Sequence, residues 1–381
     1  MKIIVAPDSF KGSISAEQAA RAMAEGILDA APDSEIIELP SADGGEGTMV
    51  NLIASTNGRM VTHQVSGPLG KLVAASYGVL GHDETCVIEI AEASGLTLLS
   101  QTERNPECAS TEGTGELIRH ALDAGFRNFI VGLGGSATND GGTGILRALG
   151  MRFLDTAGEA LPPGAGELDK LYEIDAGSFD ARIQECRFVI ASDVDNTLIG
   201  PNGASHIFGP QKGATKKMAE ALDRKLSHYA DIVENETGVS LHDYPGAGAA
   251  GGAGGAFLAF FPAVMQRGID VVLEASGFSK SVASSDLIFT GEGKSDRQTL
   301  SGKTAFGIAQ MAADHGKPVI LLSGSIDPDS REDLERFFEE VHSVSGGAVT
   351  EKQSMDNAYV HVRQRSADIL CAYLRNHHQA N

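Results

Sequence analysis

The chain has 381 residues, of which 30 are Lys or Arg and 51 are Asp or Glu, so its formal net charge is −21. Such an acidic protein repels the phosphates of nucleic acids and of anionic membranes, and we expect neither as a partner. The length allows two or three domains. The four cysteines are widely spaced and form no Cys-x-x-Cys pair, which argues against a zinc centre or a disulfide framework.

We expect no secretory signal and no membrane span. The N-terminus becomes polar too early for a signal peptide, because Pro7 and Asp8 closely follow the first apolar residues. Residues 244–266 carry no charge and are long enough to span a bilayer. Their first half is mostly Gly and Ala, however, and Pro262 interrupts the Phe-rich end. We therefore expect a Gly-rich loop that runs into a buried helix, and a cytoplasmic protein.

The first 60 residues predict strands over 2–6 and 35–39 and helices over 16–31, capped by Ser15, and over 47–54. Three strands joined by short turns follow over 61–65, 72–80 and 85–90, a pattern typical of a meander. The α/β alternation then returns, with a helix over 115–124, strands over 129–131 and 188–191, and a long charged helix over 216–233.

The last third of the chain alternates regularly, with strands over 287–289, 319–322 and 341–344 and helices over 304–315, 331–340 and 367–375. Strands and helices alternate at both chain ends, whereas the middle of the chain combines hairpins with α/β units. We therefore predict an α/β protein with a flavodoxin-like parallel-sheet domain built from both termini, residues 1–60 plus 286–381. A second, mixed α/β domain, residues 61–285, is inserted into it.

Two loops from opposite ends of the chain are expected to meet in this fold. In the flavodoxin-like strand order 2-1-3-4-5, the first strand lies beside the first strand after the insertion. Ligands bind at such a switch point, outside the carboxyl ends of the strands. The loops there are residues 7–13, with Asp8 and Lys11, and residues 290–296, with Glu292 and Lys294. Each loop combines a lysine with an acidic residue, which predicts a binding site.

A Gly-rich loop follows the predicted strand 129–131 and contains two glycines and two hydroxyl residues. Such a loop exposes backbone N–H groups that bind phosphate. Residues 132–137 also fit the dinucleotide pattern GxGxxA, and residues 246–251 fit GxGxxG without a preceding strand. An NAD-dependent hydroxyacid oxidoreductase is therefore a second hypothesis, and a non-catalytic metabolite sensor is a third.

Further candidate residues are carboxylates and lysines in loops. Asp193 and Asp195 follow the strand 188–191 at i and i+2, where they can share a divalent cation or supply a general base. Asp43, beside two glycines, is either a turn residue or an anchor for a metal or a substrate hydroxyl. Residues 301–304, Ser-Gly-Lys-Thr, imitate the end of a P-loop, but Arg297 stands where its first glycine is required.

Taken together and in this order, the loops resemble those of the bacterial glycerate kinases of the class that includes the glycerate 2-kinases. The resemblance covers essentially the whole chain and rests on residues 6–13, 42–48, 134–142, 192–196, 208–214 and 291–299. Two departures are Thr197, where a proline is expected, and Ser205 with His206, where apolar residues are usual. The absence of the proline could loosen the loop over 193–196, but it removes no polar group from the motif.

The resemblance implies ATP-dependent phosphorylation of D-glycerate to 2-phosphoglycerate with Mg²⁺, in a fold of two α/β domains. On this reading Asp193 and Lys11 are catalytic, with Asp193 the general base, and Asp193 and Asp195 bind the metal. The residues expected to bind the substrate are Asp8, Ser9, Phe10, Asp43 and Arg297. The residues expected to bind the nucleotide are Gly134, Gly135, Ser136, Thr138, Lys212 and Glu292. The partners are small molecules, and a homodimer is compatible with the sequence, which by itself decides neither the hydroxyl that accepts the phosphate nor the oligomeric state.

Overall fold

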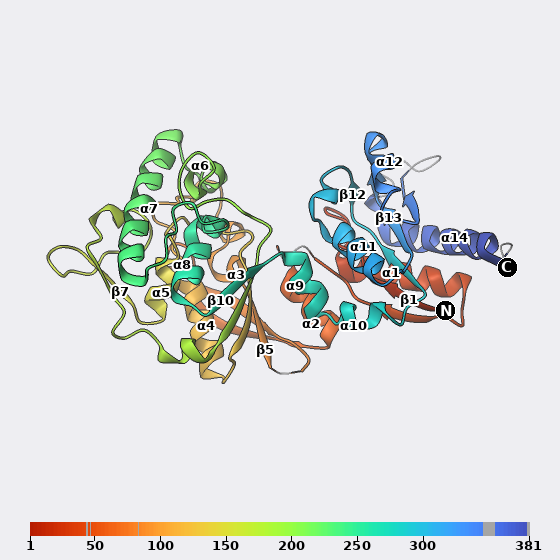
Figure 1. Ribbon diagram of the computed structural model, residues 1–381, viewed down its shortest axis with the longest axis horizontal. Helices are drawn as coiled ribbons and strands as arrows, with labels where there is room; N and C mark the ends of the chain where they lie inside the picture. The colour runs from red at the N-terminus through yellow and green to blue at the C-terminus, as the bar shows by residue number, and fades with distance from the viewer. Residues whose placement is uncertain (43–44, 46, 83, 346–354, 379–381) are drawn as a thin grey trace. The chain divides into compact units, whose positions relative to one another are not determined.

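The computed structural model describes residues 1–42, 45, 47–82, 84–345 and 355–378 (Figure 1). Asp43, a predicted substrate-binding residue, lies outside this set. The chain divides into two compact units. We call Met1–Asp43, Val50–Asn57 and Ile269–Asn381 the terminal unit, and Gly44–Met49 with Gly58–Gly268 the inserted unit. Residues 269–285, which the sequence analysis assigned to the insertion, belong to the terminal unit.

The terminal unit contains a five-stranded sheet in the order β15-β13-β11-β1-β2, with every pair parallel. Its strands are β1 (Lys2–Val5), β2 (Glu35–Glu38), β11 (Leu287–Thr290), β13 (Val319–Ser323) and β15 (Glu340–Ser343). Numbered along the chain, this order is 2-1-3-4-5, which confirms the predicted flavodoxin-like arrangement. The switch point lies between β1 and β11, which come from opposite ends of the chain.

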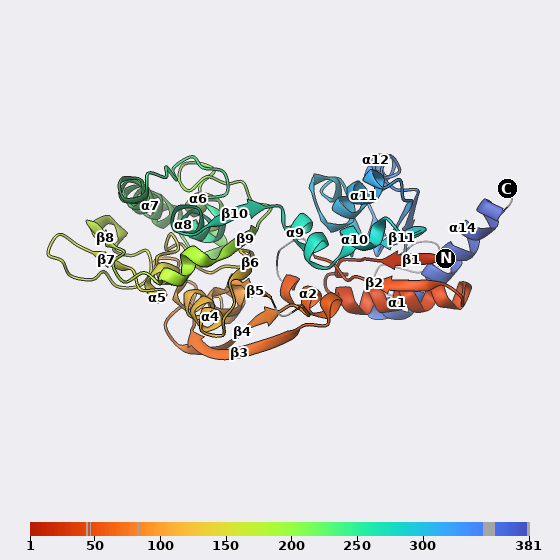
Figure 2. The same cartoon turned by 60° about the horizontal axis from the view of Figure 1, so that its bottom comes forward.

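Helices cover both faces of this sheet (Figure 2). The helices described in this unit are α1 (Ala16–Ala30), α2 (Thr48–Thr56) from Val50 on, α9 (Gly268–Ala275) from Ile269 on, α10 (Phe278–Val282), α11 (Thr304–Asp314), α12 (Arg331–Leu334) and α14 (Ala358–His378). Because strand side chains alternate between faces, Ile3 and Val5 pack with α1 and α14, whereas Ile4 packs with α9 to α12. The Ser15 cap is confirmed, as its hydroxyl accepts the Gln18 N–H at 3.1 Å.

Two of the predicted C-terminal helices have different lengths in the structure. The helix expected over 331–340 ends at Leu334, because Phe338 turns into the core and Glu340 already pairs with β13. The helix expected over 367–375 is much longer and begins at Ala358. Tertiary packing, rather than local helical preference, thus decides where the first helix ends and where the second begins.

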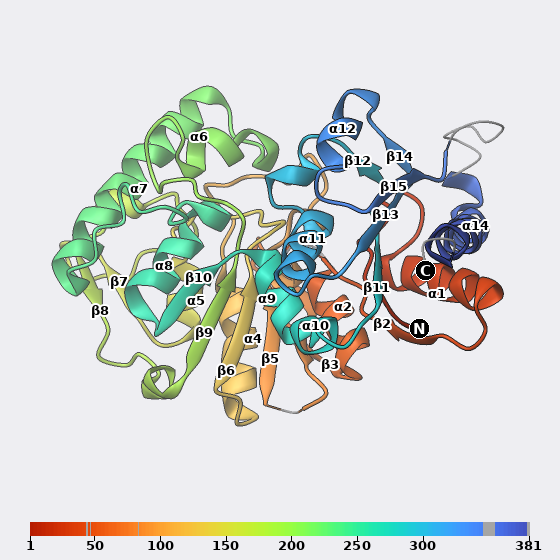
Figure 3. The same cartoon turned by 45° about the vertical axis from the view of Figure 1, so that its right-hand side comes forward.

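The inserted unit contains a six-stranded sheet in the order β10-β9-β6-β5-β4-β3. Its strands are β3 (Arg59–Ser66), β4 (Leu72–Val79), β5 (Thr85–Glu89), β6 (Asn128–Gly132), β9 (Arg187–Ala191) and β10 (Ala263–Gln266), with β7 (Arg152–Leu154) and β8 (Glu173–Asp175) paired separately. The pairs among β3, β4 and β5 are antiparallel, which confirms the meander, and the other pairs of this sheet are parallel. Figure 3 shows β9, β6 and β5 side by side.

The helices of this unit are α3 (Ile90–Ser94), α4 (Glu112–Asp123), α5 (Thr143–Ala148), α6 (Ala204–Phe208), α7 (Lys216–Thr237) and α8 (Ala253–Phe260). The uncharged stretch 244–266 begins with turns that contain many Gly and Ala residues and leads into α8. The first five residues of α8 are buried. The stretch ends in β10, a strand that the sequence analysis missed. Among the described residues, no helix combines the length and apolar character needed to cross a membrane.

Candidate active site

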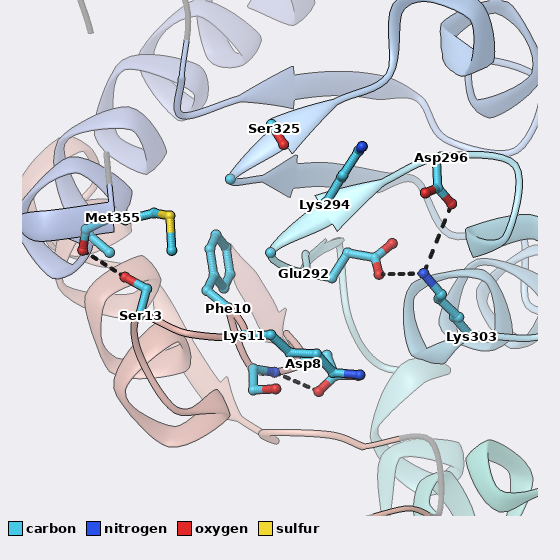
Figure 4. A pocket seen from close by; sticks show the side chains of 14 residues that line it. Asp8, Phe10, Lys11, Ser13, Glu292, Lys294, Asp296, Lys303, Ser325 and Met355 are labelled. Carbon is cyan, nitrogen blue, oxygen red and sulfur yellow. Dashed lines mark hydrogen bonds and ion pairs between the residues drawn. The ribbon is translucent and has the colours of Figure 1, made fainter. Parts of the chain in front are cut away.

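A cavity of about 390 Å³ lies at the carboxyl ends of β1 and β11 in the terminal unit (Figure 4). The loop after β1 contributes residues from Asp8 to Ser13, and the loop after β11 contributes residues from Glu292 to Asp296. The remaining lining comes from Lys303, Gly324, Ser325, Met355 and Ala358. The cavity therefore occupies the switch point at which the strand order predicts a ligand.

Glycines allow the loops around this cavity to approach closely. A Cβ atom on Gly291 would lie 1.9 Å from the carbonyl oxygen of Leu322, and one on Gly293 would lie 3.0 Å from the amide nitrogen of Lys11. The Asp8 N–H donates to the Gly291 carbonyl at 2.8 Å. The short strands β12 (Lys294–Ser295) and β14 (Ser325–Ile326) pair in parallel beside the cavity. Backbone packing thus fixes the geometry of the lining.

Two carboxylates in the cavity are held by neutral donors. Asp8 accepts the Ser9 N–H at 2.6 Å on Oδ1 and the Thr304 hydroxyl at 2.7 Å on Oδ2. Glu292 Oε1 accepts the hydroxyls of Ser295 at 2.9 Å and of Thr299 at 2.6 Å. Burial raises the pKa of Glu292, and these hydroxyl bonds oppose the rise. Both side chains are thus oriented before any ligand binds.

Three lysines line the same cavity. The Lys303 Nζ lies 3.7 Å from Glu292 Oε2 and 4.0 Å from Asp296 Oδ1. Lys11 and Lys294 are exposed, and neither forms an ion pair within the described part of the chain. Although the protein carries a net charge of −21, this cavity balances three lysines against three carboxylates. It can therefore accept a small anion that the rest of the surface repels.

The Gly-rich loop of the inserted unit connects β6 to α5. Gly134 and Gly135 are exposed, whereas Ser136 and Thr138 are buried. Gly135 has a φ of +75°, a conformation that favours glycine, and its carbonyl accepts the Leu96 N–H at 2.8 Å. The loop therefore presents glycine backbone to the solvent and keeps its hydroxyl side chains inside.

Beneath this loop lie two buried charged groups. The Lys212 Nζ donates to Ser136 Oγ at 2.9 Å and to the Thr138 carbonyl at 2.7 Å. Asp140 accepts four hydrogen bonds, from the Thr111 N–H and hydroxyl and from the N–H groups of Gly142 and Gly144. Burial raises the pKa of Asp140, and these four bonds oppose the rise.

The predicted metal ligands lie in the loop after β9. Asp193 and Asp195 are exposed, and Asp193 Oδ1 accepts the Gly268 N–H at 3.0 Å. Within the part of the chain that the structure describes, no group of three or more His, Cys, Asp or Glu side chains is arranged to hold a metal ion. Among those residues, Asp193 and Asp195 are two exposed carboxylates that belong to no such group.

The structure gathers five predicted site residues, Asp8, Ser9, Phe10, Lys11 and Glu292, around one cavity. Glu292 was predicted to bind nucleotide, but it lies among the predicted substrate ligands. Arg297 is exposed and does not line the cavity. Gly134, Gly135, Ser136, Thr138 and Lys212 form a second group, in the inserted unit.

Lys303 and Thr304, which were not predicted as site residues, contact Glu292 and Asp8 respectively. The signal was the Ser-Gly-Lys-Thr run at 301–304, which was rejected because it is not a P-loop. Its lysine and threonine nevertheless begin α11 at the edge of the cavity. A partial motif thus marked residues that contact two cavity carboxylates.

The dinucleotide patterns lack the structure that they require. After β6 ends at Gly132, the next helix begins only at Thr143, so the loop does not open directly onto a helix. The second pattern, at 246–251, follows turns rather than a strand. The oxidoreductase hypothesis therefore loses its sequence support.

Comparison with known proteins identifies the family. The model of the glycerate kinase family matches residues 3–374. A glycerate kinase from Bacillus subtilis (strain 168) is 47% identical over 369 residues, which is 97% of each chain. A glycerate 2-kinase from Escherichia coli (strain K12) is 42% identical over the same shares. The crystal structure of a "putative glycerate kinase 2" from Salmonella typhimurium LT2 has a TM-score of 0.91 and 42% identity, covering 100% of this chain and 99% of that one. The chain belongs to the glycerate kinase family.

Proposed function

We propose that the protein is an ATP-dependent glycerate 2-kinase, which converts D-glycerate and ATP to 2-phosphoglycerate and ADP. Membership of the glycerate kinase family supports the reaction class, and the name of the E. coli relative supports the 2-position. The observation that carries the proposal is the switch-point cavity, where three lysines surround oriented carboxylates. Lysines suit the carboxylate of a small hydroxy acid, and the carboxylates suit its hydroxyls.

Glycerate is proposed to bind in this cavity. Its carboxylate would face Lys11, with Lys294 and Lys303 as further cations, and its hydroxyls would donate to Asp8. Ser9 and Phe10 complete the substrate contacts on this loop. Arg297 and Asp43 remain proposed substrate ligands on the strength of the family motifs alone. Glu292 is reassigned from the nucleotide to this substrate group, because it shares the cavity with Lys11.

The nucleotide phosphates are proposed to bind at the outer face of the Gly-rich loop. The exposure of Gly134 and Gly135 supports this placement, since their backbone can approach an anion closely. Phosphoryl transfer depends mostly on positioning and on neutralisation of charge, and these cations and N–H groups would supply both.

Mg²⁺ is proposed as the metal. It usually takes one or two protein carboxylates together with phosphate oxygens and water, and Asp193 with Asp195 matches that donor set. When bound, the ion would neutralise charge on the nucleotide phosphates. Asp193 is also our proposed general base for the substrate hydroxyl.

One phosphorus NMR spectrum of the products from D-glycerate and ATP tests the proposed function. We expect the signals of ADP and 2-phosphoglycerate. Formation of 3-phosphoglycerate would leave the kinase class intact and overturn the 2-position. Glycerate binding without turnover would instead support a metabolite sensor. Cell fractionation tests the proposed cytoplasmic location, and light scattering tests the homodimer.

The Asp193→Asn variant is expected to lower kcat by about 100-fold or more, because a general base contributes ~10²–10⁴ in rate. Asp195→Asn is expected to raise the Mg²⁺ concentration needed for half-maximal rate by about tenfold, with a smaller effect on kcat. Steady-state kinetics over a Mg²⁺ titration measure both effects. Asp169→Asn, an exposed aspartate of the same unit, is the control. Near-normal turnover of Asp193→Asn would exclude the base role.

A further inference from the structure

A lysine is buried behind the Gly-rich loop rather than exposed on its outer face. Lys212 ends the short 3₁₀ helix η4 (Pro210–Lys212), and only 2% of its surface is accessible. Its ammonium donates to Ser136 Oγ and to the Thr138 carbonyl. Gly134 and Gly135, on the same loop, are exposed. Lys212 therefore contacts the loop from inside and has no surface left to meet a nucleotide directly.

The surroundings make this cation costly. Both of its hydrogen-bond acceptors are neutral, and burial lowers the pKa of Lys212 to about 7, an effect that the charge of Asp140 opposes. A buried ammonium without a carboxylate partner loses its hydration and recovers only part of that free energy from neutral acceptors. The loop is also not fully satisfied, since the buried hydroxyl of Thr138 has no hydrogen-bond partner among the described residues. Fold stability alone therefore does not account for a lysine at this position.

We propose that Lys212 is a positioning residue for nucleotide binding: it fixes the Gly134–Thr138 loop from beneath and adds positive charge behind the phosphates without touching them. The inference rests on the proposed kinase function and deepens it. It replaces the expectation from the sequence that Lys212 contacts the nucleotide. Because the charge and the loop act on the bound nucleotide, the role belongs to nucleotide affinity more than to the chemical step.

Measurements on Lys212→Met test this role. We expect the KM for ATP and the dissociation constant for ADP, measured by calorimetry, to rise by about 10- to 100-fold, with kcat within about threefold of the wild-type value. Methionine is unbranched and one atom shorter than lysine, so it retains most of the packing and removes the charge and both hydrogen bonds. Circular dichroism and urea unfolding check that the variant folds. Unchanged ADP affinity in a folded variant would overturn the proposal.

The pH dependence separates the charge from a purely structural role. Above a pKa of about 7 Lys212 loses its proton, so wild-type ADP affinity is expected to fall as the pH rises through this value. Asp140, which is held by its four donors, is the charged group that raises the pKa of Lys212. Arg104 donates to the carbonyl of the neighbouring Gln211 at 3.2 Å and stays cationic over this range. Lys212→Met should show a flat profile over the same range. An equally steep profile in both proteins would assign the titration to another group and refute the charge component.

Two further variants keep the test decisive. Ser136→Ala removes one of the two acceptors and retains the lysine, so an intermediate loss of ADP affinity is expected even if Lys212→Met does not fold. Lys225→Met is the matched control, because the Lys225 Nζ donates to the Gly166 carbonyl at 2.6 Å in the same unit, outside the Gly-rich loop. Wild-type protein that binds ADP but fails to phosphorylate glycerate would refute the proposed function without touching this inference.

Discussion

Lys11→Met is expected to lower kcat/KM for D-glycerate by about 100- to 1,000-fold, the range typical of removing one preorganised group that stabilises charge in the transition state. Lys11 lines the cavity and lies on the loop after β1. This loop is held to the loop after β11 by the hydrogen bond from the Asp8 N–H to the Gly291 carbonyl. Without its ammonium, an anionic substrate would meet Asp8 and Glu292 with less positive charge to offset them. The loss should therefore appear in both KM and kcat.

Steady-state kinetics with varied glycerate and saturating ATP measure this loss. Lys280→Met serves as the control, because Lys280 is exposed on α10 and does not line the cavity. Lys11→Arg should recover part of the activity, since it restores the charge with a different shape. If Lys11→Met retained the wild-type kcat/KM, the cavity would not be the glycerate site.

Asp140→Ala is expected to lower the free energy of unfolding by about 3–5 kcal/mol, because it leaves several buried donors without an acceptor. The carboxylate is completely buried and ties the Gly-rich loop and the start of α5 to Thr111. The loop that it holds is the proposed phosphate site. ADP affinity should therefore fall together with stability.

Urea unfolding measures the stability loss, with Asp155→Ala as the matched control. Asp155 also accepts two backbone N–H groups, from Ala157 and Glu159, but in a solvent-accessible turn. Water can replace its bonds, so its loss should cost only about 1 kcal/mol. Equal losses in the two variants would show that burial does not decide the contribution of Asp140.

Much of the fold was predictable because its signals are local. The apolar runs at 2–6 and 287–289 are short, and both form buried strands. Ser15 with Gln18 marks the start of α1 by a capping box. The regular alternation at both chain ends was enough to predict the parallel sheet and its 2-1-3-4-5 order, which the structure confirms. The predicted helix over 331–340 was too long, because Glu340 already belongs to β15 and pairs with β13.

The sequence by itself predicted which loops to propose as site loops: the lysine and carboxylate loops after β1 and β11, the Gly-rich loop after β6, and the aspartates after β9. Only the tertiary structure decided how these residues are grouped. Glu292 lies in one cavity with Lys11, and the Thr304 hydroxyl donates to Asp8. Lys212, which was predicted to bind the nucleotide, is buried behind the Gly-rich loop. The reason is physical: residue type and spacing reveal local geometry, whereas burial and contacts across hundreds of residues arise only when the strands and their loops pack together.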